Sequence, residues 1–190
     1  MTPLLRLLVS LLHLAVLPAV AEEASHSPGF LIRPDEIHVT QRERTFVISL
    51  DTAAPVRIET AWQVFTDFAN MPRFSPSLEA SKATLLEDGR VRVEQNGTAH
   101  FGPFSMRFES VREIELTPPR EIHSRQISGT TKAMESWLRL RAEDDVTLVE
   151  YRAEITPETL IPLLGTYLVK RETAKQFTYM LQEMQRRAGR

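Results

Sequence analysis

The stretch RVRVEQNGTAHFGPFSMRFESVREIEL, residues 90–116, carries the clearest structural pattern in the sequence. In residues 90–101, apolar or small residues alternate with polar residues at almost every position. Residues 104–116 show a similar alternation after the pair Gly102-Pro103, which favours a turn. A period of two residues is typical of a strand with one buried face. The stretch therefore predicts two neighbouring antiparallel strands joined by a short turn.

Four further strands are predicted on either side of this pair. In RTFVISLD (44–51), three apolar residues, Phe46, Ile48 and Leu50, fall on one face. The other three predicted strands span residues 120–130, 132–142 and 146–155. The residues IHVT (37–40) either extend the first strand or pair with it as a hairpin. Because consecutive strands joined by short turns pair with each other, these strands predict an antiparallel meander.

Two segments have the periodicity of a helix. In residues 56–67, apolar side chains recur at the i, i+3, i+4 and i+7 spacing of one helix face. Residues 158–188 carry a longer apolar stripe and predict a long helix at the end of the chain. One sheet and one long amphipathic helix predict an α+β fold, in which a curved antiparallel sheet of six to seven strands wraps around the C-terminal helix.

The segment TDFANMPRFSPSL (66–78) is too apolar for a free loop and too rich in proline for a long helix. A second short helix is expected to begin within it at Pro72. The apolar residues around this break are Phe65, Phe68, Met71 and Phe74. Two short helices between the first strand and the meander would close one end of the curved sheet, so we interpret them as a lid with its apolar side inward.

The first 21 residues differ from the rest of the chain. Arg6 precedes the apolar run LLVSLLHLAVL (7–17), which is followed by the small-residue pattern Ala19-Val20-Ala21. This order is typical of a secretory signal peptide cut after Ala21. An uncleaved membrane anchor is the alternative, although the run is short against the roughly 20 residues that span a bilayer. We expect a signal peptide at 1–21, a linker and N-terminal extension at 22–43, a folded domain at 44–188, and export to the periplasm or the cell exterior.

Composition restricts the classes of partner and chemistry. The 190 residues carry a formal net charge of −2, so no basic excess favours nucleic acid. The chain has no cysteine, and its fold cannot rely on disulfides. The five histidines, at positions 13, 26, 38, 100 and 123, lack the spacing of a metal site, and neither a Gly-rich phosphate loop nor a G-x-S-x-G motif occurs. The sequence therefore predicts no metal, no cofactor and no catalytic set, and it leaves the oligomeric state open.

The predicted inner faces mix polar with apolar residues. Gln95, Ser110, Arg112 and Ser136 are in phase with apolar neighbours on their strands. In residues 122–130 both faces carry polar side chains, so either Ile122, Ser124, Gln126 and Ser128 or His123, Arg125, Ile127 and Gly129 point inward. A buried polar group without a partner costs about 1–3 kcal/mol. Exposure at a sheet edge or pairing between strands explains such groups, and so does a ligand cavity with a few polar points.

Charged residues give weaker indications. Arg112, Arg125 and Glu109 could form a polar cluster inside the sheet, which is interpreted first as a structural ion pair and second as a group that polarises a carbonyl. Asp67 is expected to cap a turn before acting as a base. The segments KRETAK and QRR of the last helix are interpreted as its solvated face, and they leave a transient membrane contact open.

The sequence resembles the START/polyketide cyclase (SRPBCC) superfamily, and within it the coenzyme-Q-binding, START-like branch. Three stretches carry the resemblance, which covers residues 44–187. They are AWQVFTDFANMPRFSPSLEAS (61–81), VRVEQNGTAHFGPFSMRFESVREIELTPPREIHSRQISGT (91–130) and LLGTYLVKRETAKQFTYMLQEMQRR (163–187). The resemblance implies a helix-grip fold with a hydrophobic tunnel between sheet and helix. Members bind lipids, quinones, sterols or polyketides, and a minority are cyclases or hydrolases.

These patterns together predict an exported binding or carrier protein for a hydrophobic small molecule, lipid or quinone-like, held between the sheet and the C-terminal helix. A polyketide cyclase- or hydrolase-like enzyme using the same cavity is the alternative, and a contact module with a filled core is the third hypothesis. The predicted cavity and lid residues are Phe65, Phe68, Met71, Phe74, Gln95, Phe101, Phe104, Met106, Phe108, Arg112, Arg125, Met134, Leu138, Tyr151, Leu164 and Leu168.

Overall fold

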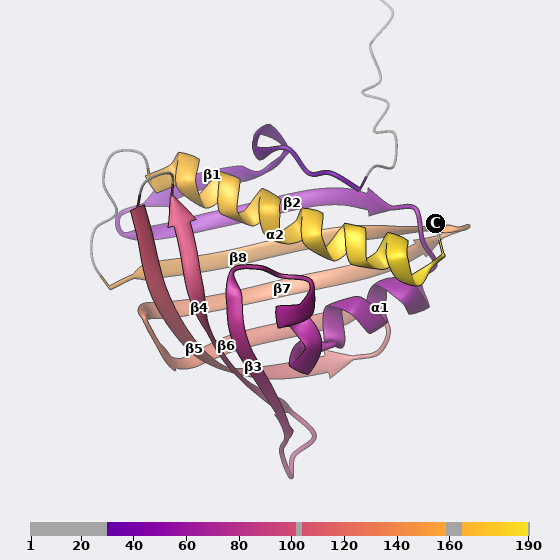
Figure 1. The fold of residues 1–190 in the computed structure, drawn as a ribbon, viewed down its shortest axis with the longest axis horizontal. Coiled ribbons are helices and arrows are strands. Elements are labelled where there is room, and N and C mark those ends of the chain that lie inside the picture. The colour runs from indigo at the N-terminus through magenta and orange to yellow at the C-terminus, as the bar shows by residue number, and fades with distance from the viewer. Residues whose placement is uncertain (1–29, 102–103, 159–164, 190) are drawn as a thin grey trace, which may run out of the picture.

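The fold is a single antiparallel sheet that curves around one long helix (Figure 1). The computed structural model describes residues 30–101, 104–158 and 165–189; the side chains of residues 100, 101 and 104 are also outside this description. Its sheet has eight strands in the order β1-β2-β8-β7-β6-β5-β4-β3. The α+β helix-grip prediction is confirmed, but the described residues form eight strands where six to seven were expected.

The strands follow the chain as β1 His38–Arg42, β2 Thr45–Ala54, β3 Leu78–Leu85, β4 Val91–Phe101, β5 Phe104–Thr117, β6 Glu121–Gly129, β7 Thr131–Glu143 and β8 Val146–Pro157. The helical elements are the 3-10 turn η1 Pro34–Glu36, the helix α1 Ile58–Thr66, the 3-10 helix η2 Phe68–Arg73 and the long helix α2 Gly165–Arg187. From β3 to β8 every strand pairs with the next one along the chain, which confirms the predicted meander.

Alternation along β2 and β8 builds the solid part of the interior. Phe46, Ile48 and Leu50 of β2 are all 2% exposed or less. Their partners on β8 include Ala153 and Tyr151, which point to the same face. Every second residue of a strand lies on the same face, because successive side chains point to opposite sides of a sheet. This half of the sheet is therefore covered by tightly packed apolar side chains.

Helix α2 lies diagonally across the inner face of the sheet (Figure 1). Ala174, Phe177, Leu181 and Met184 follow the predicted stripe and are at most 5% exposed. The helix was predicted to span residues 158–188, and of this range residues 159–164 lie outside the described chain. Within the described residues, no helix has the length and apolar character that a membrane crossing requires.

Helix α1 packs beside the C-terminal part of α2, and η2 packs against β3 (Figure 1). Helix α1 confirms the prediction for residues 56–67 in its periodicity, with Ala61, Val64 and Phe65 buried. The second element differs from the prediction, because it is a 3-10 helix that begins at Phe68 and contains Pro72. Proline fits there because the short 3-10 helix makes few hydrogen bonds that its ring could remove.

The edges of the sheet are the short strand β1 and the exposed strand β3. Strand β1 pairs with β2, so IHVT belongs to a hairpin partner of β2. Before it, Ile32 and Ile37 are buried in the core, and the backbone nitrogen of Ile32 donates to Thr178 Oγ1 of α2 at 2.9 Å. The part of the N-terminal extension from residue 30 onward is thus packed on the domain. The predicted signal peptide lies outside the described residues.

A candidate ligand cavity between the sheet and the long helix

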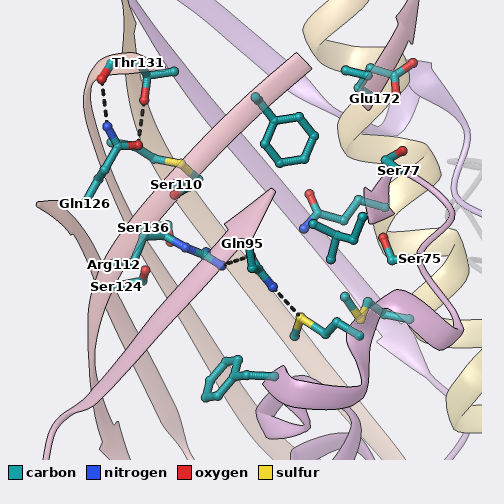
Figure 2. A pocket seen from close by; sticks show the side chains of 18 of the residues that line it. Ser75, Ser77, Gln95, Ser110, Arg112, Ser124, Gln126, Thr131, Ser136 and Glu172 are labelled. Carbon is teal, nitrogen blue, oxygen red and sulfur yellow. Dashed lines mark hydrogen bonds between the residues drawn. The ribbon is translucent and has the colours of Figure 1, made fainter. Parts of the chain in front are cut away.

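A cavity of about 370 Å³ lies between α2, the lid elements α1 and η2, and the inner faces of β4 to β8. Its wall is mainly apolar, with polar side chains spread over neighbouring strands (Figure 2). A larger hollow of about 1140 Å³ lies among strand ends and charged side chains such as Arg120, Arg139 and Glu150. The smaller cavity is the candidate site, because binding sites for small molecules combine apolar walls with a few polar groups.

The structure brings ten of the predicted cavity residues to this wall. They are Phe65, Phe68, Met71, Gln95, Met106, Phe108, Arg112, Met134, Leu138 and Tyr151. Two other predicted residues, Phe101 and Phe104, have side chains outside the description, and Leu164 lies in the segment that is not described. The ten residues come from α1, η2 and the strands β4, β5, β7 and β8, so the site exists only in the folded chain.

Three predicted cavity residues, Phe74, Leu168 and Arg125, lie elsewhere. Phe74 follows η2 and packs under the guanidinium of Arg187, which is 5.7 Å from its ring centroid. Leu168 is half-buried on α2 outside the wall, because the part of α2 that faces the cavity begins with Glu172, one turn further along. The rotational phase of α2 decides the position of Leu168, and the end of η2 decides that of Phe74. Neither position follows from the hydrophobicity of the residue alone.

Arg125 corrects the predicted polar cluster. Strand β6 turns Ile122, Ser124 and Gln126 inward, so Arg125 lies on the outer face with its side chain 65% exposed. There it pairs with Glu135, Nη2 to Oε1 at 2.9 Å. Hydrogen bonds from Arg125 and from His123 lower the pKa of Glu135. Glu109 is exposed at the cavity margin. The predicted cluster of Arg112, Arg125 and Glu109 is therefore wrong.

Arg112 is the cation of the cavity. It stands beside a register shift between β5 and β6 at Val111/Arg112, and such bulges re-aim side chains. Its terminal guanidinium nitrogen Nη2 donates to Gln95 Oε1. The amide of Gln95 in turn donates to Met71 Sδ at 3.4 Å (Figure 2) and to Ser81 Oγ at 3.1 Å. Ser81 Oγ then donates to the carbonyl oxygen of Phe68 at 2.6 Å, so a hydrogen-bond chain joins Arg112 to the lid.

The electrostatic environment of Arg112 is unusual because its hydrogen-bond partner is a neutral amide. Among the described residues, no carboxylate forms an ion pair with it, so the first interpretation as a structural ion pair is wrong. Burial lowers the pKa of Arg112, partly opposed by its interaction with Tyr151. Burial also raises the pKa of Tyr151 to about 12, against the effects of Arg112 and of a hydrogen bond with Ser136. The phenol is therefore neutral at pH 7 and does not compensate the arginine charge.

Several polar atoms of the wall have no partner among the described residues. They are Arg112 Nε, Ser110 Oγ and Ser124 Oγ, each shielded from bulk solvent. Figure 2 shows Arg112, Ser124 and Ser136 side by side on neighbouring strands. By contrast, Gln126 and Thr131 satisfy each other further along the wall, with Thr131 Oγ1 donating to Gln126 Oε1 at 2.6 Å. Unsatisfied hydrogen-bonding capacity is thus concentrated around Arg112.

Some lining residues carry no clear signal in the sequence. Ser75 and Ser77 follow the lid, and Glu172, Gln176 and Tyr179 come from the polar positions of α2. A helix face next to a cavity can carry polar residues, because the cavity does not demand the apolar contacts of a packed core.

Asp67 lies at the junction of α1 and η2, in the N-cap position of η2, but its side chain makes no capping hydrogen bond to the backbone, so it is not the expected side-chain cap. Its carboxylate accepts from Asn70 Nδ2 at 2.7 Å and from Arg187. These partners give it a structural role outside the cavity wall. The described residues contain no cluster of three or more histidine or acidic side chains that could hold a metal ion.

A sheet gripping a helix around an apolar cavity defines a class of small-molecule-binding folds, and the sequence places the chain within it. Residues 54–179 match the profile of the family described as polyketide cyclase / dehydrase and lipid transport. This match covers more than half of the chain, which therefore belongs to that family. No curated protein sequence matches the chain.

Solved structures share this architecture. A Thermus thermophilus protein, TTHA0849, is 14% identical with a TM-score of 0.61, over 75% of this chain and 99% of that chain. The Zhui aromatase/cyclase from Streptomyces sp. R1128 is 17% identical with a TM-score of 0.61, over 76% and 96%. A START superfamily protein from Mycobacterium smegmatis is 14% identical with a TM-score of 0.56, over 75% and 97%. At these identities the similarity establishes the START-like, helix-grip fold alone.

Proposed function

We propose that this protein is an exported binding or carrier protein for a hydrophobic small molecule, held in the cavity between the sheet and α2. The observation that carries the proposal is the composition of the cavity wall. Phe65, Phe68 and Phe177 supply aromatic surface at the lid end, and Met106 and Met134 supply adaptable apolar surface at the other. A molecule that covers this surface would remove it from water at about 25 cal/mol per Å².

The cavity volume limits the size of the ligand. A volume of 370 Å³ equals roughly a dozen waters at about 30 Å³ each. It lies near the lower end of the roughly 300–1,000 Å³ that is usual for small-molecule sites. A lipid with one short chain, or the ring of a quinone, matches this size, whereas a lipid with two long chains does not. Lipid and quinone-like molecules remain the leading classes, in keeping with the resemblance to the coenzyme-Q-binding branch.

Export is part of the proposal and rests on the signal-like residues 1–21. Expression of the full chain in a bacterium, followed by fractionation and mass determination of the protein, tests it. We expect a periplasmic or secreted protein whose first residue is Glu22. A cytoplasmic protein with the full mass would contradict export and leave the ligand proposal unaffected.

Binding is tested with a fluorescent fatty-acid probe on protein stripped of lipid, together with native mass spectrometry of protein purified gently. Ser124→Phe places a ring inside the cavity, whereas Arg125→Phe places the same ring on the outer face of the same strand. We expect probe binding to the wild type and to Arg125→Phe, and at least a tenfold loss for Ser124→Phe. Equal binding to all three proteins, or no binding to the wild type, would overturn the proposal.

The alternative function, a cyclase-like enzyme, is favoured by one observation. Arg112 and the neutral phenol of Tyr151 interact at the wall of a mainly apolar cavity, where hydrogen-bond donors polarise a carbonyl more strongly than in water. An aromatase/cyclase is among the proteins with this fold. This alternative predicts that Tyr151→Phe abolishes turnover of a linear polyketide mimic while its binding persists. Absence of turnover by a wild type that binds the mimic would reject it.

A further inference from the structure

The cavity contains a cation, Arg112, for which the described residues supply no counter-ion. Arg112 Nη2 donates to the neutral Gln95, its Nε has no partner, and no hydrogen bond involves its Nη1 among the described residues. A guanidinium taken out of water without an anion costs several kcal/mol in desolvation, and one hydrogen bond from the charged group to a neutral amide returns only about 1.5–3 kcal/mol. The ligand-free fold therefore holds a positive charge that no anionic side chain of the described residues compensates.

The other charges of the wall do not compensate Arg112. Tyr151 is neutral at pH 7. Glu109 is exposed at the margin, and Glu172 pairs with its own helix neighbours, at 3.3 Å from Lys175 Nζ and 3.4 Å from Arg171 Nη2. Neither acid forms an ion pair or a hydrogen bond with Arg112 among the residues described. The centre of the cavity is therefore positive.

Two hydroxyls complete a site for an anion. Ser110 lies two residues before Arg112 on β5, and Ser124 lies diagonally across from it on β6, where Ile114 pairs with Ser124 and Arg112 with Gln126. Both hydroxyl oxygens lack a partner among the described residues, and a hydroxyl can turn its proton toward an acceptor. We propose that Arg112, Ser110 and Ser124 bind the carboxylate of an amphipathic acid whose apolar part fills the rest of the cavity. This inference rests on the proposed function and names the ligand class.

The carboxylate is the group that best fits this arrangement. A guanidinium offers a planar fork of donors that matches the two oxygens of a carboxylate, and such charge-assisted bonds are about twice as strong as neutral ones. When the ligand arrives, its oxygens would take the free donors of Arg112, and Gln95 would keep its bonds to the lid through Ser81 and Met71. A neutral ester, amide or quinone carbonyl could accept one bond but would leave the positive charge uncompensated.

Two matched pairs of ligands test this inference. Isothermal titration compares decanoate with decanamide and 2-naphthoate with 2-naphthamide, so that charge changes while the linear or the ring frame stays the same. We expect each carboxylate to bind the wild type about 10- to 100-fold more tightly than its amide. Arg112→Met should remove the preference and Arg112→Lys should retain part of it, whereas Arg125→Met on the outer face should leave it intact.

The following outcomes would overturn the proposed carboxylate site. Equal affinity for the carboxylate and the amide of a pair would overturn the inference while supporting the proposed function. A carboxylate preference that survives in Arg112→Met, with melting curves showing a folded variant, would also overturn it. If Arg112→Met does not fold, the ligand pairs on the wild type and on Arg112→Lys still decide. Absence of binding for all four molecules would overturn the inference and count against the proposed function as well.

Discussion

Arg187, in the last turn of α2, donates through Nη2 to Asp67 Oδ2 at 2.6 Å, at the junction of α1 and η2. The same guanidinium donates through Nε to Glu183 Oε1 at 2.7 Å and lies over the ring of Phe74. The C-terminal residues QRR therefore do not form a purely solvated face. One arginine holds the lid against the helix that the sheet surrounds.

Replacing Arg187 with methionine should loosen the lid. Both side chains of the pair with Asp67 are only 23% exposed, so the pair lies between a surface and a buried ion pair. We expect the free energy of unfolding to fall by about 1–3 kcal/mol, measured by urea denaturation. Arg186→Met is the matched control, because Arg186 is 71% exposed and its side chain pairs with Glu183 on its own helix. Equal effects of the two substitutions would contradict a role of Arg187 in holding the lid.

Glu183 should make stability depend on acid pH. Hydrogen bonds from Arg186 and Arg187 lower the pKa of this carboxylate from 4.5 to about 2 in the folded protein. Because the folded pKa lies below the unfolded one, Glu183 stabilises the fold above about pH 4.5, and this contribution is lost as the pH falls toward 2. Melting temperatures of Glu183→Gln and wild type should therefore differ at pH 6 and converge near pH 2. A difference that stays constant from pH 6 to pH 2 would show that the carboxylate charge is irrelevant.

Arg112→Met should stabilise the ligand-free protein. The substitution removes a part-buried cation for which the described residues supply no counter-ion, and it costs one hydrogen bond to Gln95. We expect a net gain of about 1–2 kcal/mol in the free energy of unfolding, measured in urea on lipid-free protein. Arg125→Met, on the outer face, should change the value by no more than about 0.5 kcal/mol. A destabilised Arg112→Met would mean that Arg112 is compensated within the chain.

Gly97 lies where β4 passes close to the backbone of Ser77, which connects η2 to β3. A Cβ atom at this position would lie 2.0 Å from the carbonyl oxygen of Ser77, which accepts a hydrogen bond from Thr98 N at 2.9 Å and is therefore fixed. Gly97→Ala should cost about 3 kcal/mol or more in unfolding free energy, measured by urea denaturation. The neighbouring Asn96→Ala faces outward and should be nearly neutral. A stable Gly97→Ala would show that the backbone at Ser77 can move.

The sequence predicts the sheet and α2 well because each has one covered face. Strands such as β2 and β8 alternate, since only one of their faces meets the core. The edge strand β3, LEASKATL, gives no such pattern, and none of its residues is fully buried. Neither face of an edge strand needs to be apolar, so period two disappears. The prediction therefore missed β3, and the sheet has more strands than expected.

The candidate site could be predicted only in part. Gln95, Arg112 and Tyr151 stand in phase with apolar neighbours, and the phase alone places them inward. Strand β6 is polar on both faces, so pairing with β5 and β7 decides that Ser124 points inward and Arg125 outward. Among the described residues, Arg112 contacts an amide and forms no ion pair with a carboxylate, and the sequence pattern cannot predict this tertiary contact. It depends on which side chains separate strands bring together.

A crystal structure of the protein with 10-bromodecanoate tests the central claim most directly. We expect an anomalous bromine signal inside the cavity between the sheet and α2, with the carboxylate about 2.7–2.9 Å from the guanidinium of Arg112. A cavity filled by the protein's own side chains, or bromine bound only on the outer surface at saturating ligand, would contradict it.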